Sequence, residues 1–434
     1  MKIEEIIENK RDKKVLSDEE IKFFIDGYTN NIIPDYQASA LLMAIYINGM
    51  NKREIATLTL AMKDSGEIWD LSDISGLKVD KHSTGGVGDK VSLILGPMVA
   101  SCGAKLAKMS GRGLGHSGGT IDKMESIPHM RTSLSYEEFK KEVKEVGMAI
   151  IGQNEHIDPA DKKLYALRDV TGTVSSIPLI ASSIMSKKLA SGSDCILLDV
   201  KYGSGAFMKT IKDAKKLATT MVEIGEELHK DVKAEITNMD QPLGYAVGNN
   251  LEIKEVVNTL QGHGPKDLME ICLQSGTVML LQAKIFDDKK KARKALIDSI
   301  TSGKAFKKFK EFVAFQGGDI SYIDDLSKFP MANNIIPIYS SKEGYITKID
   351  ALAIGVGAMN LGGGREKLGD VIDMSAGIIL NKKLGDRVNK SELLATLYTN
   401  KEEYKEVYLK VKKAFKIGKN KKLNNNESNE DLIG

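Results

Sequence analysis

Cysteine is scarce in this sequence of 434 residues, and the few cysteines present form no recognisable pattern. Cys102, Cys195 and Cys272 are odd in number, lie far apart and include no Cys-x-x-Cys pair. This argues against a disulfide framework and gives no support for a zinc site. The sequence therefore fits a reducing compartment.

Strong net charge and long apolar runs are also missing. The net charge of +3 is small for this length, whereas a nucleic-acid-binding protein normally has a larger or clustered basic excess. No apolar run approaches the length of a bilayer span. The N-terminal stretch MKIEEIIENKRDKK contains acidic residues and no apolar core, unlike a secretory signal. We therefore expect a cytoplasmic protein that binds neither nucleic acid nor membranes.

The composition that remains is that of a globular protein with more than one domain, at 42% hydrophobic and 28% charged residues. Residues 1–66 have the pattern of helices. Ser17 and Glu20 form a capping box, and Gly49 and Gly66 end two later helices. These residues carry no obvious chemistry, so we predict an all-α domain used for packing or dimerisation.

Beyond this segment, short strands run into loops of glycine and hydroxyl residues. The clearest strands are LKVDK, AKLAKMS and CILLDVK, at 77–81, 104–110 and 195–201. In open α/β sheets the carboxyl ends of the strands line the ligand crevice. We therefore predict an α/β domain over 70–157 and 192–335, with its loops forming a pocket rich in backbone N–H groups.

Two further segments complete the predicted organisation. Asp158 and the proline after it have the pattern of a helix start, and the helices of 158–191 are expected to pack on the N-terminal domain. Short apolar runs alternate with glycine turns over 345–415, which predicts a small α+β domain. Residues 416–434 are polar and low in complexity, so a frayed tail is expected there. The predicted fold class is a mixed-sheet α/β protein with a separate all-α domain.

The first glycine-rich loop, KHSTGGVGDKVS (Lys81–Ser92), has the chemistry of an anion site. It is no P-loop, because Gly-Asp-Lys-Val replaces Gly-Lys-Ser/Thr, and it lacks the third glycine of a dinucleotide fingerprint. Its glycines let backbone N–H groups approach an anion, and Ser92 lies near a helix N-terminus. Lys81 adds positive charge and Ser83 a hydroxyl donor. From these residues alone, an anion site and a structural turn both stay open.

A second loop, Lys108–Ile127, repeats this chemistry. Its amine and hydroxyl side chains among the glycines include Lys108, Ser110, Ser117 and Thr120. Two such loops, each following a strand, favour a phosphate pocket more than either loop alone. Asp122 and Glu125 would repel a phosphate, so we expect them to orient lysines or to cap a helix.

A third group of polar residues lies on the helices of 158–191. Ser183 and Lys187 are four residues apart and share one helix face, and Arg168 ends the preceding helix. They could present donors to a heterocycle or a carboxylate, although cations on helices more often face solvent. His82, inside the first loop, is a candidate acid or hydrogen-bond donor. The other histidines show no metal-ligand spacing.

At SGRGLGHSGGTIDKMESI the sequence resembles the thymidine and pyrimidine-nucleoside phosphorylase family. The same family's patterns are similar to KHSTGGVGDKVSL, LYALRDVTGTVSSIPLIASSIMSKKLA, DVKYGSGAFMK and QPLGYAVGNNLEIKE. The resemblance covers nearly the whole chain except its polar end. It implies an all-α domain, a larger α/β domain, and a homodimer joined mainly through the α domain.

The reaction that this resemblance implies is reversible phosphorolysis without an organic cofactor. Inorganic phosphate would attack C1′ of a pyrimidine nucleoside (uridine, thymidine or deoxyuridine). The products would be the free base and a pentose 1-phosphate, with inversion at C1′. A cleft between the two domains would have to close to bring the substrates together.

The resemblance also implies roles for individual positions. Phosphate would be held by Lys81, His82, Ser83, Ser92, Lys108, Met109, Ser110 and Thr120. The nucleoside would be held by Arg168, Ser183 and Lys187. The residues implied in catalysis are His82, Arg168 and Lys187, the two cations stabilising the negative charge that the departing base gathers. Some family members also bind a potassium ion, which here would contact Gly88, Lys90, Leu243, Ala246 and Glu255.

Several positions depart from the family pattern. A small residue is usual at Lys90, and an ammonium there could displace the cation. Ser117, Tyr202 and Pro128–Met130 also differ, but none is a donor named above. Three other functions stay open: a thymidine-restricted phosphorylase, a relative of anthranilate phosphoribosyltransferase, and a catalytically silent nucleoside-binding protein. The second would need a Gly-Thr-Gly-Gly-Asp loop, which is absent here.

Overall fold

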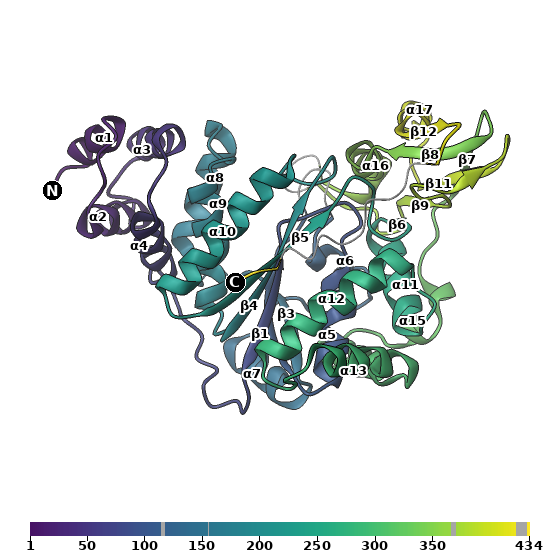
Figure 1. The fold of residues 1–434 in the computed structure, drawn as a ribbon, viewed down its shortest axis with the longest axis horizontal. Helices are drawn as coiled ribbons and strands as arrows, with labels where there is room; N and C mark the ends of the chain where they lie inside the picture. Colours follow the sequence, from purple (N-terminus) through teal and green to yellow (C-terminus); the bar gives the residue numbers. More distant parts are fainter. Residues whose placement is uncertain (114–117, 155, 366–369, 422–431) are drawn as a thin grey trace.

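The chain forms a helical N-terminal part, a central α/β domain and a small C-terminal domain at the opposite end (Figure 1). The computed structural model describes all residues except 114–117, 155, 366–369 and 422–431. Among the described residues, no helix is both long and apolar enough to cross a bilayer.

The N-terminal part is a bundle of helices with one apolar core. Its helices are α1 (Ile3–Arg11), α2 (Asp18–Thr29), α3 (Asp35–Asn48), α4 (Lys52–Lys63), α8 (Pro159–Thr171) and α9 (Ile177–Ala190). The capping box of Ser17 and Glu20 is present at the start of α2. Ala160, Leu164 and Leu179 of α8 and α9 are buried in the same core as α1–α4. Segments far apart in the sequence therefore build this bundle together.

The central domain is built on a six-stranded sheet in the order β13-β5-β4-β1-β2-β3. Its strands are β1 (Lys78–Ser83), β2 (Lys105–Ser110), β3 (Met148–Gly152), β4 (Cys195–Tyr202), β5 (Asp231–Asn238) and β13 (Leu432–Ile433). β1 to β5 run parallel and β13 pairs antiparallel with β5, so the predicted mixed sheet is confirmed. Because β4, β1 and β2 are neighbours, the loops that follow them leave the same edge of the sheet.

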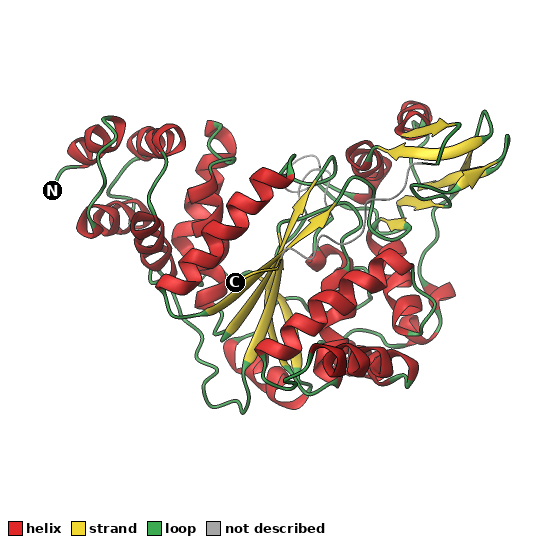
Figure 2. Ribbon diagram, in the orientation of Figure 1, coloured by secondary structure: helices red, strands yellow, loops and turns green. Residues whose placement is uncertain are grey.

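Helices cover both faces of this sheet (Figure 2). Successive residues of β4 face opposite sides: Leu197 packs with the core of α5 (Val91–Ser101) and α12 (Lys266–Gln282), and Leu198 with that of α9 and α10 (Ile211–Glu227). The other helices of the domain are α6 (Thr120–Glu125), α7 (Tyr136–Glu145), α11 (Asn249–Leu260), α13 (Lys289–Thr301), α14 (Lys304–Phe315) and α15 (Ser321–Asp324). Helix α9 therefore packs on the sheet and also belongs to the helical bundle.

The C-terminal domain contains two small antiparallel sheets, of order β10-β8-β12 and β6-β9-β11-β7. Its elements are β6 (Ala246–Val247), β7 (Asn334–Tyr339), β8 (Gly344–Ile349), α16 (Ala351–Ala358), β9 (Gly377–Leu380), β10 (Arg387–Val388), β11 (Leu393–Thr399), α17 (Lys405–Ala414) and β12 (Phe415–Gly418). Strand β6 belongs to the chain before α11, so this domain is joined to the central one through a shared sheet.

The expectation of a frayed tail from residue 416 is wrong in the part that the structure describes. Residues 415–418 form β12 and pair with β8. Leu432 and Ile433 form β13 on the edge of β5. The edge strand β5 has unpaired backbone N–H and C=O groups, and the backbone of Leu432 and Ile433 pairs with them. The intervening residues 422–431 lie outside the described ones.

Candidate functional site

A cluster of buried charges lies at the carboxyl end of β1 and β4. Lys81 Nζ donates to Asp199 Oδ2 at 2.6 Å, and Lys201 Nζ lies 2.8 Å from the same oxygen. All three side chains are buried. Burial alone would lower the pKa of Lys81, but the carboxylates of Asp199 and Asp89 outweigh it and raise that pKa above its usual value. Lys81 is therefore a charged lysine whose ammonium already has a carboxylate partner.

Asp89 connects this cluster to the first glycine loop. Its Oδ2 accepts a hydrogen bond from the Ser83 hydroxyl at 2.5 Å, and its Oδ1 accepts the Val91 N–H at 3.2 Å. Burial alone would raise the pKa of Asp89, but the ammonium groups of Lys201 and Lys81 outweigh this effect. The pKa of Asp89 therefore lies below its usual value. An ionised Asp89 thus stands at the N-terminus of α5 and orients Ser83.

Lys108, at the end of β2, is a buried lysine of a different kind. Its Nζ donates to the backbone oxygen of Lys81 and lies 3.8 Å from Asp80 Oδ1. Burial and the nearby Lys188 lower the pKa of Lys108 to about 7. Lys188, on α9, donates at 2.7 Å both to Asp80 Oδ2 and to the Met109 carbonyl. Helix α9 is therefore tied directly to β1 and β2.

His82 lies between the strand lysines and those of α9. Desolvation of its ring, together with the ammonium groups of Lys188, Lys108 and Lys187, lowers the pKa of His82 well below its usual value. The imidazole is consequently neutral near physiological pH.

The helical side of the site is organised around Asp161 of α8. Lys187 Nζ donates to Asp161 Oδ2 and, at 3.0 Å, to Ser183 Oγ one helical turn earlier. The Lys187 side chain keeps 23% of its surface exposed, whereas Asp161 is buried. Lys187 and Ser183 are thus held together, as their spacing predicted, with Ser183 buried and Lys187 partly exposed.

Arg168 is buried beside them. Its Nη1 donates to the Leu179 carbonyl at 3.1 Å and its Nη2 to the Val174 carbonyl at 2.8 Å. The buried Nε has no hydrogen-bond partner among the described residues. Burial lowers the pKa of Arg168, although a guanidinium remains protonated at any ordinary pH. Arg168 therefore retains one buried donor without a partner among the described residues.

The remaining predicted phosphate donors lie around the same edge of the sheet. Ser110 ends β2, Ser92 is the second residue of α5, and Thr120 begins α6. All three are half-buried, whereas Met109 is buried and its carbonyl accepts from Lys188 Nζ. No hydrogen bond joins these hydroxyls to the buried lysines in the part of the chain that the structure describes. Whether they bind phosphate stays a prediction.

Asp122 and Glu125 have partners different from those expected. Asp122 Oδ1 lies 2.8 Å from Arg365 Nη1, and Glu125 Oε1 accepts from Arg112 Nη2 at 2.7 Å. The expectation that they orient lysines or cap a helix is therefore wrong: they bind arginines, and Arg365 comes from the C-terminal domain. The neighbouring departure at Ser117 lies outside the described residues.

The other departures from the family pattern lie apart from these contacts. Tyr202 Oη accepts a hydrogen bond from Asn238 Nδ2 at 3.3 Å. His129 has φ of 65°, in the left-handed region that favours glycine, and the next residue, Met130, is buried in the central core. The Pro128–Met130 departure thus places a non-glycine residue in a strained turn.

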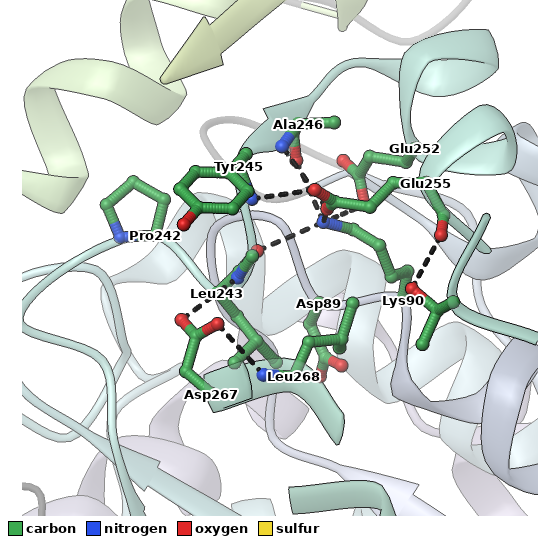
Figure 3. Close-up of polar contacts among 12 residues, drawn as sticks. Asp89, Lys90, Pro242, Leu243, Tyr245, Ala246, Glu252, Glu255, Asp267 and Leu268 are labelled. Carbon is green, nitrogen blue, oxygen red and sulfur yellow. Dashed lines mark hydrogen bonds and ion pairs between the residues drawn. The ribbon is translucent and has the colours of Figure 1, made fainter. Parts of the chain in front are cut away.

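The residues expected around potassium do converge, but they surround the ammonium of one of them (Figure 3). Lys90 Nζ donates to the carbonyls of Leu243 at 3.0 Å and Ala246 at 2.9 Å, and to Glu255 Oε2 at 2.5 Å. Gly88 has φ of 74°, and a Cβ there would lie 2.7 Å from Leu243 O. Because the ammonium already occupies the position that these oxygens surround, the residues present do not fit a potassium ion.

Several buried charged side chains that contact the predicted residues were missed by sequence reasoning. They are Asp80, Asp161, Lys188, Asp199 and Lys201. For Asp80, Asp199 and Lys201 the signal was a charged residue inside an apolar strand, as in CILLDVK, because such a charge needs a partner when it is buried. Asp161 and Lys188 lie on helices and had no such signal. The partner itself could not be read, since Lys81 and Asp199 are 118 residues apart.

Comparisons with known proteins match this architecture part by part. The helical bundle domain of the glycosyl transferase family matches residues 4–66, the a/b domain of that family matches 75–306, and the pyrimidine nucleoside phosphorylase C-terminal domain matches 345–418. The crystal structure of anthranilate phosphoribosyltransferase (TrpD) from Thermus thermophilus has a TM-score of 0.58 and 17% identity. The match covers 72% of this chain and 99% of the anthranilate phosphoribosyltransferase chain. At this identity it shows only that the two proteins share a fold.

Curated relatives are much more similar in sequence. Pyrimidine-nucleoside phosphorylases of Staphylococcus epidermidis and Geobacillus stearothermophilus are 54% and 52% identical over 96% of this chain and 96% of theirs. The enzyme of that name from Bacillus subtilis is 54% identical over 95% of both chains. The resemblance stated from the sequence motifs is thereby confirmed, and this chain belongs to the pyrimidine-nucleoside phosphorylase family.

Proposed function

We propose that this protein catalyses the reversible phosphorolysis of pyrimidine nucleosides, with uridine, thymidine and deoxyuridine as substrates. The observation that carries the proposal is the meeting of two sets of donors across one site. Lys188 of α9 donates to Asp80 of β1 and to the Met109 carbonyl of β2, so the helices that carry Arg168, Ser183 and Lys187 are joined directly to the strands that carry Lys81 and Lys108. The near-full-length identity to curated enzymes with this name supports the same reaction.

On the sheet side, we propose that phosphate binds to the amines and hydroxyls of the two glycine loops. These are Lys81, Ser83, Ser92, Lys108, Ser110 and Thr120, with His82 and the backbone of Met109. Lys108 has a pKa of about 7, so it is only partly charged before phosphate arrives. A bound dianion would favour its protonated form, because an opposite charge nearby raises the pKa of a lysine. Phosphate binding would then be coupled to proton uptake.

On the helical side, we propose that Arg168, Ser183 and Lys187 hold the pyrimidine. A phosphate oxygen attacks C1′, the C1′–N1 bond breaks, and its electron pair stays on the departing base. The two cations stabilise this charge more in the transition state than in the ground state, which lowers the barrier. Because this is one displacement, a β-nucleoside would give an α-pentose 1-phosphate.

His82 would act as a neutral hydrogen-bond donor. Its lowered pKa leaves no extra ring proton to transfer near physiological pH. Its N–H can still donate to the departing base or to phosphate. The base would therefore leave as an anion stabilised by Arg168 and Lys187.

We also propose a homodimer that forms through the helical bundle. Exposed apolar side chains lie along one stripe of α3, and α3 packs beside α8, which adds Val170. The stripe consists of Tyr36, Met43, Tyr46 and Ile47. A contiguous apolar surface of this kind is typical of a protein interface. Sedimentation should show a dimer that dissociates when Tyr36→Asp is introduced; a wild-type monomer would refute the dimer.

A cytoplasmic location is part of the same proposal. The three cysteines are free thiols, as expected in a reducing compartment. Fractionation of the source cells, followed by immunoblotting, should recover the protein with the cytosol.

The proposed reaction is tested by incubating the protein with uridine, thymidine or deoxyuridine, each with and without inorganic phosphate. Chromatography of the free bases should show release from all three nucleosides only when phosphate is present. Release of base without phosphate would contradict the mechanism. Release from thymidine but not uridine would replace the broad specificity with a thymidine-restricted one.

A further inference from the structure

The contact between the first glycine loop and the 243–246 turn is made by a lysine, although its surroundings are those of a cation site. The Lys90 ammonium is directed at two backbone carbonyls, those of Leu243 and Ala246, and at one carboxylate, that of Glu255 (Figure 3). The Lys90 side chain is completely buried. Oxygen ligands of this type are those that hard metal cations prefer in proteins.

The turn is shaped around this charge. Gly244 has φ of 67°, and a Cβ there would lie 2.4 Å from Glu255 Oε2 and 3.1 Å from Lys90 Nζ. The N–H groups of Tyr245 and Ala246 donate to the Glu255 carboxylate at 2.9 and 3.2 Å. Glu255 is therefore fixed by two backbone donors, and among the described residues its ion-pair partner is the Lys90 ammonium.

The other charged groups that face this position are already paired. Glu252 lies 4.0 Å from Lys90 Nζ but 3.0 Å from Lys123 Nζ. Asp267 lies 2.9 Å from Lys383 Nζ on the other side of the turn. Removal of the Lys90 charge would consequently leave Glu255 as a buried carboxylate without its direct ion-pair partner, together with two carbonyls that lose their donor.

Lys90 also connects this turn to the rest of the first glycine loop. It directly follows Asp89, the residue that orients Ser83, and it is the N-cap of α5. Two other residues of the first glycine loop also contact the turn. Gly88 lies against the Leu243 carbonyl, and the Val87 carbonyl accepts the Leu243 N–H at 3.0 Å. The first glycine loop therefore packs directly on the turn that encloses the Lys90 ammonium.

We propose that the Lys90 ammonium replaces a bound monovalent cation, so that this protein orders its phosphate loop without potassium. The charge is attached covalently and is present at every salt composition. It supplies three hydrogen bonds in fixed directions, whereas an exchangeable ion would have to be taken from solution. The kinetic part of this inference rests on the proposed phosphorolysis, but its structural part does not.

The test compares the wild-type protein with Lys90→Ser and Lys90→Met in potassium chloride and in choline chloride at equal ionic strength. Serine leaves the oxygen-lined space open, whereas methionine fills it with an uncharged chain of similar length. Scanning calorimetry gives Tm for each protein, and kcat/KM for phosphate gives a second readout.

For the wild-type protein we expect the same Tm and the same kcat/KM in both salts. Lys90→Ser should lose several degrees of Tm in choline and recover most of them saturably with potassium. Lys90→Met should be destabilised in both salts and should not respond to potassium. Crystals of Lys90→Ser soaked in rubidium chloride should show an anomalous peak among Leu243 O, Ala246 O and Glu255.

Two results would overturn the inference. One is a saturable rise in wild-type Tm with potassium over choline, which needs no variant and stays decisive if Lys90→Ser does not fold. The other is a Lys90→Ser protein that responds to potassium no more than Lys90→Met. If no phosphorolysis is detected at all, the Tm measurements still decide the question, so failure of the proposed reaction and failure of this inference can be told apart.

Discussion

The sheet side and the helical side of the site use positive charge in different ways. On the sheet side, Lys81 and Lys201 share the buried Asp199, and Lys108 has a pKa of about 7. On the helical side, Arg168 donates to backbone carbonyls and Lys187 to a single carboxylate, that of Asp161. The sheet side therefore has many donors in one electrostatic network, part of which can change its charge. The helical side depends on few cations.

This difference predicts how the two sides fail. Loss of one donor among many should weaken phosphate binding without abolishing the reaction. Loss of one helical cation should remove stabilisation that is needed only in the transition state, because the negative charge on the base appears there.

The largest effect is expected for Lys187→Ala. This variant should lose about 100-fold or more in kcat/KM for the nucleoside, since removal of one preorganised transition-state donor costs about that much. Steady-state kinetics with saturating phosphate measures the loss. Near-normal kinetics would remove Lys187 from the site.

Two controls accompany that measurement. Lys266→Ala, at an exposed lysine on α12, should leave the kinetics unchanged. Because Lys187→Ala deprives the buried Asp161 of its ammonium, the double variant with Asp161→Asn removes that unpaired charge. The double variant should regain stability, seen as a higher Tm, but not activity.

Smaller effects are expected for two serines, one on each side of the site, and each should affect a different substrate. Ser83→Ala should raise KM for phosphate about tenfold, and Ser183→Ala should raise KM for the nucleoside about tenfold, as expected for a hydrogen bond to a charged or strongly polar ligand. Each variant should leave the other substrate's KM nearly unchanged. If both serines affected the same substrate, the division between the two sides would be wrong.

The smallest effect concerns pH. Lys108 has a pKa below that of an ordinary lysine, so it is charged below about pH 7 and loses its charge as the pH rises above that value. We expect kcat/KM for phosphate, expressed per phosphate dianion, to fall several-fold between about pH 7 and pH 8.5. The corresponding value for the nucleoside at saturating phosphate should not follow this curve. A profile for phosphate that stays flat over this range would show that Lys108 does not contribute its charge.

Local features of the fold could be predicted from the sequence. The start of α2 followed from the Ser17–Glu20 capping box, and that of α8 from Asp158 and the proline after it. The three strands that run into glycine loops, now β1, β2 and β4, were recognised as well. Each of these signals lies within a few residues of the feature that it predicts, so the sequence contains the information locally.

Long-range pairing could not be predicted in the same way. The contacts of Lys81 with Asp199, and of Lys90 with Glu255, join residues more than a hundred positions apart. Strand β13 was missed because two apolar residues are too few to form a recognisable strand pattern in the sequence. They form a strand only because they pair with the edge of β5. The sequence showed that Lys90 was unusual, but only the folded chain shows which oxygens surround its ammonium.

The central claim is that inorganic phosphate itself becomes bonded to C1′ of the sugar. Phosphorus NMR of a reaction with uridine follows this directly. The signal of inorganic phosphate should decrease as that of α-ribose 1-phosphate increases, with one equivalent formed for each uracil released. Uracil release with an unchanged phosphate signal would mean hydrolysis by water and would contradict the account.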